Sequence, residues 1–340
     1  MKHFRFKQTG EPLAVLTLED APTPTPGDYD VLVRMLLAPI HPSDLHVLRG
    51  RFGRQPQLPA TPGLEGMGEI EAIGSGVKGL SVGTRVVLLD VPGSWSTHVV
   101  APAERVVPVP DNVSNEDAAQ ALVNPVTAIA MTIYAHKLKS GDTLLQSAAS
   151  FVVGQLVLQI AKANGFRTIN LVRRAEQTQE VSARGGDVVI CTADDVWQAQ
   201  VLSATEGRGV LSAIDCVAGE IGAGIARCLA PGGRLLVFGA LSSHRKTELS
   251  AFQMPVFSPN LIYKATTVEG WFLPHWLSVT PLSETRATLE LVLRRLSSHK
   301  LRLPAAVRHP LSALETALRE AESTQRQGKP LLDFTTVPDS

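Results

Sequence analysis

The chain has 340 residues, more than one ordinary domain of about 100–200 residues, so two domains are expected. Its composition of 44% hydrophobic and 19% charged residues is typical of a soluble globular protein and excludes disorder over most of the length. Because 32 Lys and Arg residues balance 32 Asp and Glu residues, neither a nucleic acid nor an anionic membrane is the expected partner.

The first third of the chain is predicted to form β-structure. Short apolar or alternating runs cover residues 31–36, 68–73 and 84–89. Turn-rich stretches such as 22–27 and 74–76 separate them. This spacing predicts a twisted antiparallel sheet or a partial barrel.

From about Asn124 onward, the pattern alternates between strands and helices. The predicted strands cover residues 143–145, 168–172, 187–190, 210–214 and 234–238, and the predicted helices cover 153–161, a stretch ending at about residue 184, and 221–229. Repeated alternation of this kind predicts a parallel, doubly wound sheet with helices on both faces. The fold class is therefore α/β.

The C-terminal part is predicted to contain two helices and a strand. The first helix has an apolar face made of Leu289, Val292, Leu293 and Leu296. The second is predicted to begin at a capping box, because Ser312 and Glu315 have the required spacing. A last strand is expected over residues 331–334.

The first βα turn of a doubly wound sheet is the usual place for a pyrophosphate, since helix N-terminal amides favour anions. Here the turn spans residues 147–154 and keeps only Gly154 of the usual glycine pattern. Phe151 and Val152 stand where the backbone must approach a phosphate. Two interpretations remain open for this turn: a nucleotide site, or a purely structural connection.

The end of the second strand of this sheet carries Arg173 and Arg174 and no acidic residue. An NAD site usually has an acid there for the ribose hydroxyls, whereas the 2′-phosphate of NADP calls for arginine. A bound nucleotide is therefore predicted to be NADP(H) rather than NAD(H). The alternative is a pair of solvated arginines at a strand end.

The three cysteines, Cys191, Cys216 and Cys228, have no C-x-x-C spacing. They predict neither a disulfide framework nor a cysteine-built zinc site, and small buried hydrophobic residues are the simplest interpretation. The sequence shows no apolar run of membrane-spanning length and no signal-peptide core. The cytoplasm is the expected compartment.

Six segments together resemble the medium-chain dehydrogenase/reductase superfamily over nearly the whole chain. They are residues 39–44, 62–66, 124–128, 154–159, 167–173 and 270–276. The most similar branch is the zinc-free one of 2-enoyl thioester reductases and quinone-oxidoreductase-like proteins. The resemblance implies a discontinuous GroES-like catalytic domain of residues 1–123 and 271–340, with a Rossmann nucleotide-binding domain of residues 124–270 between its parts. It also implies an active site in the cleft between the domains, and a homodimer.

The resemblance further implies NADPH as the cofactor. The implied contacts are Asn124, Thr127, Ser150, Phe151, Val152, Val153, Arg173, Arg174, Phe238, Gly239, Ala240, Leu241, Trp271, Phe272, Leu273 and Lys329. Arg173 matches the first arginine of the family's 2′-phosphate pair, and Arg174 compensates for Ala175 at the second position. Phe52, Trp271 and Trp276 are assigned to the substrate pocket, although plain interdomain packing also explains a single aromatic residue.

Zinc is not expected. Alcohol dehydrogenases of the superfamily carry cysteine and histidine ligands on the loops that match residues 41–44 and 63–66. In this sequence the first loop has no cysteine, and Leu64 occupies the usual histidine position. His41 and Glu65 do not supply the three protein ligands that a catalytic zinc site keeps.

The main departure from the enoyl-reductase pattern is Phe52, where the family has a tyrosine. Phenylalanine cannot donate a proton, so water or His41 must supply it, and His41 is the candidate catalytic acid. Three functions follow. The first is an NADPH-dependent reductase of an activated C=C bond in an enoyl thioester, enal or enone. The others are an NADPH:quinone reductase, which needs no tyrosine, and a non-catalytic accessory protein with a degraded cofactor loop.

Overall fold

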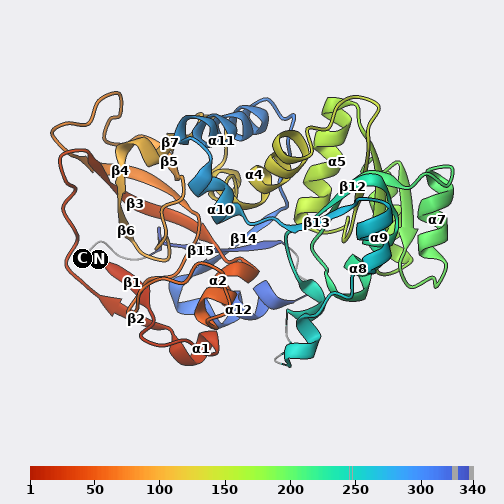
Figure 1. Cartoon of the computed structure of the whole chain (residues 1–340). Coiled ribbons are helices and arrows are strands. Elements are labelled where there is room, and N and C mark those ends of the chain that lie inside the picture. The colour runs from red at the N-terminus through yellow and green to blue at the C-terminus, as the bar shows by residue number, and fades with distance from the viewer. Residues whose placement is uncertain (245, 247, 324–327, 337–340) are drawn as a thin grey trace. The chain divides into compact units, whose positions relative to one another are not determined.

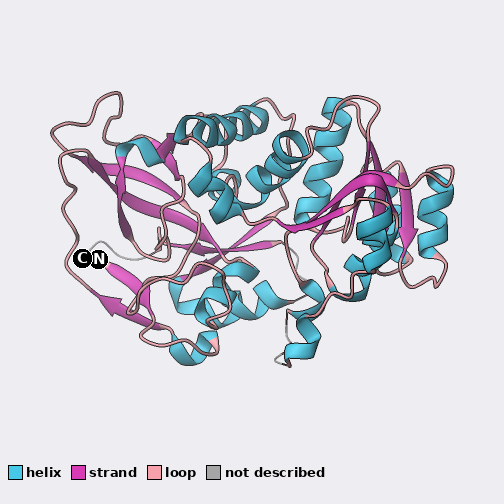
Figure 2. Cartoon of the chain, in the orientation of Figure 1, coloured by secondary structure: helices cyan, strands magenta, loops and turns pink. Residues whose placement is uncertain are grey.

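The computed structural model describes residues 1–244, 246, 248–323 and 328–336. The chain folds into two compact units, Met1–Val126 with Leu277–Ser340 and Thr127–Trp276. Figure 1 follows the chain by colour, and Figure 2 separates strands from helices. The first unit is assembled from both ends of the chain, whereas the second is one continuous segment.

The first unit is built on a mainly antiparallel sheet in the order β14-β15-β3-β4-β5-β7, with β6 also paired to β3. Its strands are β3 (Asp30–Pro39), β4 (Met67–Ile73), β5 (Arg85–Leu88), β6 (His98–Pro102), β7 (Val106–Pro108), β14 (Ala306–Pro310) and β15 (Lys329–Asp333). A separate two-stranded sheet pairs β1 (Lys2–Arg5) with β2 (Thr17–Asp20). The predicted β-structure of the first third is confirmed.

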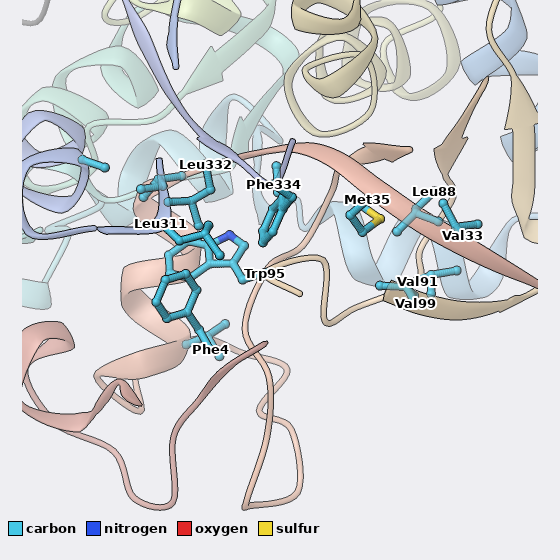
Figure 3. Close-up of a cluster of buried hydrophobic side chains, with 14 of the residues drawn as sticks. Phe4, Val33, Met35, Leu88, Val91, Trp95, Val99, Leu311, Leu332 and Phe334 are labelled. Atoms are coloured by element: carbon cyan, nitrogen blue, oxygen red, sulfur yellow. The ribbon is translucent and has the colours of Figure 1, made fainter. Parts of the chain in front are cut away.

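Helices surround this sheet and cover its apolar core. They are α1 (Pro12–Val15), α2 (Pro42–Leu48), α3 (Asn115–Ala119), α11 (Leu282–Ser297) and α12 (Leu314–Glu322), with 3-10 turns η1 (Ala103–Arg105) and η5 (Leu311–Ala313). Figure 3 shows part of the core, in which Phe4 packs edge-on against Trp95, with ring centroids 6.4 Å apart, and Leu332 and Phe334 lie nearby. Residues from the start and the end of the chain thus share one core.

The second unit contains a parallel sheet in the order β10-β9-β8-β11-β12-β13. Its strands are β8 (Thr143–Gln146), β9 (Arg167–Val172), β10 (Val188–Cys191), β11 (Val210–Asp215), β12 (Leu229–Val237) and β13 (Thr267–Gly270). The strand order reverses between β8 and β11, which is the doubly wound arrangement that the sequence predicts. The inner strands are buried on both faces, and they accordingly show continuous apolar runs rather than alternation.

The helices of this unit connect successive strands. They are α5 (Val152–Asn164), α6 (Glu176–Ala183), α7 (Trp197–Ala204), α8 (Gly219–Arg227) and α9 (Ser258–Tyr263), with η2 (Ala130–Ala135), η3 (Leu241–Ser243) and η4 (Leu249–Phe252). Two helices, α4 (Val123–Ile129) and α10 (Leu273–Val279), contain the points where the chain passes between the units. The structure therefore confirms a doubly wound α/β unit and a β-rich unit.

One local prediction is wrong. The capping box at Ser312 does not form, because Ser312 lies inside the 3-10 turn η5 and α12 begins at Leu314 without a side-chain cap. The helix predicted around residues 221–229 is confirmed as α8, although it ends at Arg227 because Leu229 already belongs to β12. Among the described residues, no helix is both long and apolar enough to cross a bilayer.

Candidate functional site

A buried polar cluster in the first unit surrounds His41, the N-cap residue that precedes α2. The backbone amide of His41 donates to Oδ2 of Asp44 at 2.7 Å, and the amide of Leu64 donates to Oδ1 of the same carboxylate at 3.1 Å. Burial raises the pKa of Asp44 to about 7, although both amide donors oppose that change. Asp44 thus holds the first turn of α2 against the loop that contains Leu64.

The imidazole of His41 lies between a cation and an anion. Nζ of Lys329 donates to its Nδ1 at 2.8 Å, and its Nε2 is hydrogen-bonded to the carboxylate of Glu65. An ammonium can only donate, so Nδ1 accepts and the ring proton sits on Nε2. All three side chains are almost fully buried. His41 therefore connects two opposite charges in the interior of the unit.

Glu65 extends this cluster to the start of α4. Its Oε2 accepts hydrogen bonds from the backbone amides of Leu122 at 2.9 Å and Val123 at 2.7 Å. A carboxylate is favourable there, because the helix N-terminus carries unpaired amides and partial positive charge. Asn124, a predicted cofactor residue, follows directly in the first turn of α4. The position of that turn depends on Glu65 and, through it, on His41.

A second set of candidate residues lies in the second unit, at the carboxyl ends of β8 and β11, where the strand order reverses. Ser147 follows β8 and donates to Oδ1 of Asp215 at 2.5 Å. The amides of Val217 and Ala218 also donate to Asp215, at 2.9 and 2.8 Å. Burial raises the pKa of Asp215, and these three donors oppose the rise. This carboxyl holds the two strand ends together.

The glycine-poor turn between β8 and α5 is tightly packed. A Cβ on Gly154 would lie 2.6 Å from Cα of Ala149, so only glycine fits there. Ala148 adopts a left-handed conformation with φ of 48°. The side chain of Phe151 is 43% exposed and lies outside the core. The turn keeps the close helix approach of a nucleotide site without its other glycines.

Arg173 and Arg174 follow β9, and both side chains are exposed. Among the described residues, neither guanidinium has a carboxylate within 4.0 Å. Gln177 at the start of α6 donates from Nε2 to Oγ of Ser150 at 2.8 Å and accepts from the amide of Arg174 at 3.1 Å. The end of β9 and the β8–α5 turn are therefore joined by one side chain.

The remaining cofactor residues predicted in this unit follow β12 and β13 at the same sheet edge. Phe238 donates its amide to the carbonyl of Asp215 at 2.8 Å, and Leu241 donates to that of Cys216 at 2.9 Å. Trp271 donates its amide to the carbonyl of Val237 at 2.8 Å. Gly239, Ala240, Phe272 and Leu273 lie beside these residues in the chain. Ligands of open α/β sheets bind at this edge.

Other predicted residues lie elsewhere in the fold. Phe52 is half-buried and packs against the core of the first unit. The ring of Trp276 packs against Tyr134, with centroids 5.9 Å apart. Thr127 is buried in α4. Lys329 is buried beside His41, in the first unit, and is not among the residues at the edge of the parallel sheet.

Comparison with known proteins agrees with this architecture. Residues 27–111 match the alcohol dehydrogenase GroES-like domain, and residues 152–293 match the family described as zinc-binding dehydrogenase. Mitochondrial enoyl-[acyl-carrier-protein] reductase of Rattus norvegicus is 31% identical over 91% of this chain and 82% of the relative. The human protein of the same name is 32% identical with the same coverage. The chain belongs to the medium-chain dehydrogenase/reductase superfamily.

Solved structures of this superfamily have the same fold over the full length. Quinone oxidoreductase of Pseudomonas syringae superposes with a TM-score of 0.84, at 26% identity, covering 98% of this chain and 99% of that one. Quinone oxidoreductase of Escherichia coli, solved in complex with NADPH, gives a TM-score of 0.85 at 25% identity, covering 98% and 100%. The discontinuous first unit and the inserted parallel sheet are thus shared with superfamily members.

Zinc occurs in part of this superfamily, but the donor set around His41 does not fit it. The imidazole contacts a lysine ammonium at Nδ1 and a carboxylate at Nε2, and Leu64 supplies no donor beside Glu65. An ammonium at 2.8 Å from the imidazole opposes binding of a second cation. Within the described residues, no group of three His, Cys, Asp or Glu side chains is arranged to hold a metal ion.

The sequence alone did not identify several residues that the structure places in the His41 cluster or at the edge of the parallel sheet. Glu65 has only its spacing from His41 as a signal, and Asp44 has its place three residues after that histidine. Gln177 offers a weak signal, because a polar residue in the first turn of a helix often contacts the preceding loop. Asp215 is the last residue of the buried strand β11, and acids at the carboxyl ends of parallel strands are candidates for a site. The pairing of Lys329 with His41 has no local sequence signal.

Proposed function

We propose that this chain is an NADPH-dependent reductase of an activated C=C bond, in an enoyl thioester or in an enal or enone. The observation that carries the cofactor assignment is the pair Arg173 and Arg174, exposed and without carboxylate partners in the described structure, where an NAD site has an acid. The names of the curated relatives support the substrate class. The partner is a small molecule.

NADPH supplies a hydride when it is bound, and the chain has to orient the cofactor and deliver a proton. Arg173 and Arg174 are proposed to bind the 2′-phosphate, and Ser150, Phe151, Val152 and Val153 to lie at the pyrophosphate. The proposed nicotinamide and nucleotide contacts are Asn124, Thr127, Phe238, Gly239, Ala240, Leu241, Trp271, Phe272, Leu273 and Lys329. The proposed domains are residues 1–123 with 271–340 and residues 124–270, within a few residues of the two compact units.

His41 is proposed as the proton donor, because Phe52 has no hydroxyl. Nδ1 of its ring accepts from Lys329 and Nε2 contacts Glu65, so a proton that leaves Nε2 can be replaced at Nδ1 by one from the Lys329 ammonium. Phe52, Trp271 and Trp276 are the proposed substrate-pocket residues. His41→Asn is expected to remove one ionisation from the pH profile of kcat. An unchanged pH profile would make water the proton source.

The first experiment titrates the purified chain with NADPH and, separately, with NADH, and follows the melting temperature and nucleotide fluorescence. Binding to the native state raises the melting temperature as RT ln(1 + [L]/Kd) predicts. NADPH is expected to bind well and NADH poorly. Oxidation of NADPH is then measured with 2-enoyl thioesters, enones and quinones. If neither nucleotide binds at millimolar concentration, the chain is the non-catalytic accessory protein instead.

Quinone reduction is the second candidate. Phe52 favours it, since both quinone oxygens can take protons from water and no hydroxyl of the protein is needed. Phe52→Tyr separates the two reactions. If the substrate is an enoyl thioester or enone, the added hydroxyl is expected to raise kcat for that substrate. If the substrate is a quinone, the variant is expected to leave kcat unchanged.

The chain is further proposed to form a homodimer and to be located in the cytoplasm. Within the part of the chain that the structure describes, strand β13 forms one edge of the parallel sheet and pairs only with β12, so its outer side can accept another strand. Next to it in the chain, α9 exposes Ile262 at 68% and Tyr263 at 84%. Light scattering is expected to give twice the chain mass, and Ile262→Glu to give a monomer. Fluorescent tagging against cytosolic and mitochondrial markers tests the compartment.

A further inference from the structure

The side chain of Gln177 makes one hydrogen bond to each of two loops in the second unit. From the first turn of α6, Nε2 donates to Oγ of Ser150 at 2.8 Å, and Oε1 accepts the backbone amide of Arg174 at 3.1 Å. Ser150 belongs to the β8–α5 turn, and Arg174 to the loop after β9. The orientation of the Gln177 side-chain amide follows from this contact, because the backbone N–H of Arg174 needs an acceptor and only Oε1 of Gln177 can accept. Gln177 therefore sets the spacing between the two loops.

This contact makes the oxygen of Ser150 an acceptor and leaves its proton for another partner. Because Oγ already accepts from Gln177, its own O–H must point to another acceptor. No such acceptor occurs among the described residues, and the Ser150 carbonyl is occupied by the side-chain amide of Gln155 at 2.7 Å. The hydroxyl of Ser150 can therefore donate a hydrogen bond to a bound ligand.

The charges of the loop that Gln177 connects to Ser150 suit a doubly charged anion. The guanidinium groups of Arg173 and Arg174 are exposed and have no carboxylate within 4.0 Å in the described part of the chain. Glu176 is the nearest acid in sequence, and it pairs with neither arginine at that distance. Two cations and one hydroxyl form a donor set that a phosphate monoester accepts and a ribose hydroxyl does not need.

We propose that Gln177 is the specificity-determining positioning residue for the phosphorylated nucleotide. The backbone of Ser150 stays assigned to the pyrophosphate, whereas its hydroxyl, held by Gln177, is assigned to the 2′-phosphate of NADPH together with the arginine loop. This inference rests on the proposed NADPH-dependent function and adds a residue that acts through Ser150 and Arg174 rather than by touching the nucleotide. Preformed groups lose less entropy on binding, so the effect of Gln177 falls on affinity.

The test compares binding of NADPH, NADH and adenosine 2′,5′-bisphosphate by calorimetry, without turnover. Gln177→Met keeps the length of the side chain and removes both hydrogen bonds. It is expected to weaken binding of NADPH and the bisphosphate by about tenfold and to leave NADH binding unchanged. Gln177→Glu is expected to weaken the binding of both phosphorylated ligands further. Its carboxylate accepts the hydrogen bond of the Ser150 hydroxyl and repels the phosphate. Gln179→Met, an exposed change on the same helix, is the matched control.

A double-variant cycle separates positioning from general damage. Ser150→Ala is expected to weaken NADPH binding. The double variant with Gln177→Met is expected to lose less affinity for NADPH than the product of the two single fold-losses. Equal losses for NADH and NADPH in Gln177→Met, or no loss for either, would overturn the role of Gln177. If the unaltered chain binds no nucleotide, the proposed function fails instead, so the two failures are distinguishable.

Discussion

Lys329 donates a hydrogen bond from Nζ to Nδ1 of His41 at 2.8 Å, although 288 positions separate the two residues in the chain. Both residues are almost fully buried, and the other ring nitrogen contacts the buried carboxylate of Glu65. The neutral imidazole thus connects an interior cation and an interior anion, neither of which water can solvate. Several expected results depend on this arrangement.

Replacement of His41 by leucine is expected to destabilise the chain by about 3–5 kcal/mol, because it leaves a buried ammonium and a buried carboxylate without their shared partner. His41→Asn is expected to cost less, since a carboxamide has both a donor and an acceptor. Urea unfolding of the two variants and the unaltered chain measures this difference. Equal stability of the leucine and asparagine variants would contradict the bridging role of the ring.

Asp44 is expected to make the chain less stable as the pH rises from about 4 to about 7. Burial raises the pKa of Asp44 from 3.8 to about 7, so the folded chain keeps a proton that the unfolded chain has released. The free energy of unfolding then falls with rising pH, by at most about 1.4 kcal/mol per pH unit. Urea unfolding at pH 5 and pH 7.5 is expected to show a larger loss in the unaltered chain than in Asp44→Asn. Parallel losses would contradict the raised pKa.

His136 is expected to act in the opposite direction. Burial lowers the pKa of His136 from 6.5 to about 4, although its Nε2 is hydrogen-bonded to the carbonyl of Ala213 at 3.0 Å. The unfolded chain therefore binds the extra proton, and the stability contributed above pH 6.5 is lost as the pH falls towards 4. His136→Gln keeps a donor for the carbonyl and is expected to flatten the loss between pH 6.5 and 4.5. Thermal melts at these pH values test this.

Gly154→Ala is expected to destabilise the chain by about 1–3 kcal/mol and to weaken NADPH binding, because the new Cβ meets the backbone of Ala149. That backbone cannot yield as a flexible side chain would. Gly270→Ala is the matched control, since no atom lies within 4 Å of its added Cβ. Thermal unfolding and nucleotide titration check both variants. Similar melting temperatures for the two would show that the turn can relax.

The sequence predicts the parallel sheet well, because each strand buried on both faces is a continuous apolar run bounded by turns. The sheet edge that carries the candidate residues follows from the same pattern. Arg173 and Arg174 could be selected as candidate 2′-phosphate residues from the sequence, because that assignment depends only on the strand that they follow. The match between residues 331–334 and β15 likewise rests on local apolar character.

The parts that sequence reasoning missed depend on long-range contacts. Nothing near Lys329 shows that it contacts His41, and nothing near Glu65 shows that it accepts amides from Leu122 and Val123. The spacing of Ser312 and Glu315 is correct for a capping box, but the chain tightens into a 3-10 turn before the helix begins. A local pattern is overridden there by the way the segment leaves β14.

The antiparallel pairing of β15 with β3 affects how the chain is made. Leu37 and Asp333 are partners in that ladder, so about 300 residues are synthesised between them. At about 5–20 residues per second, β3 waits roughly 15–60 s on the ribosome before its partner exists. The segment Thr127–Trp276 is continuous and is complete before that point. During translation the unit with the parallel sheet can therefore fold first, while the unit that holds His41 cannot pair β3 with β15 until Asp333 has been made.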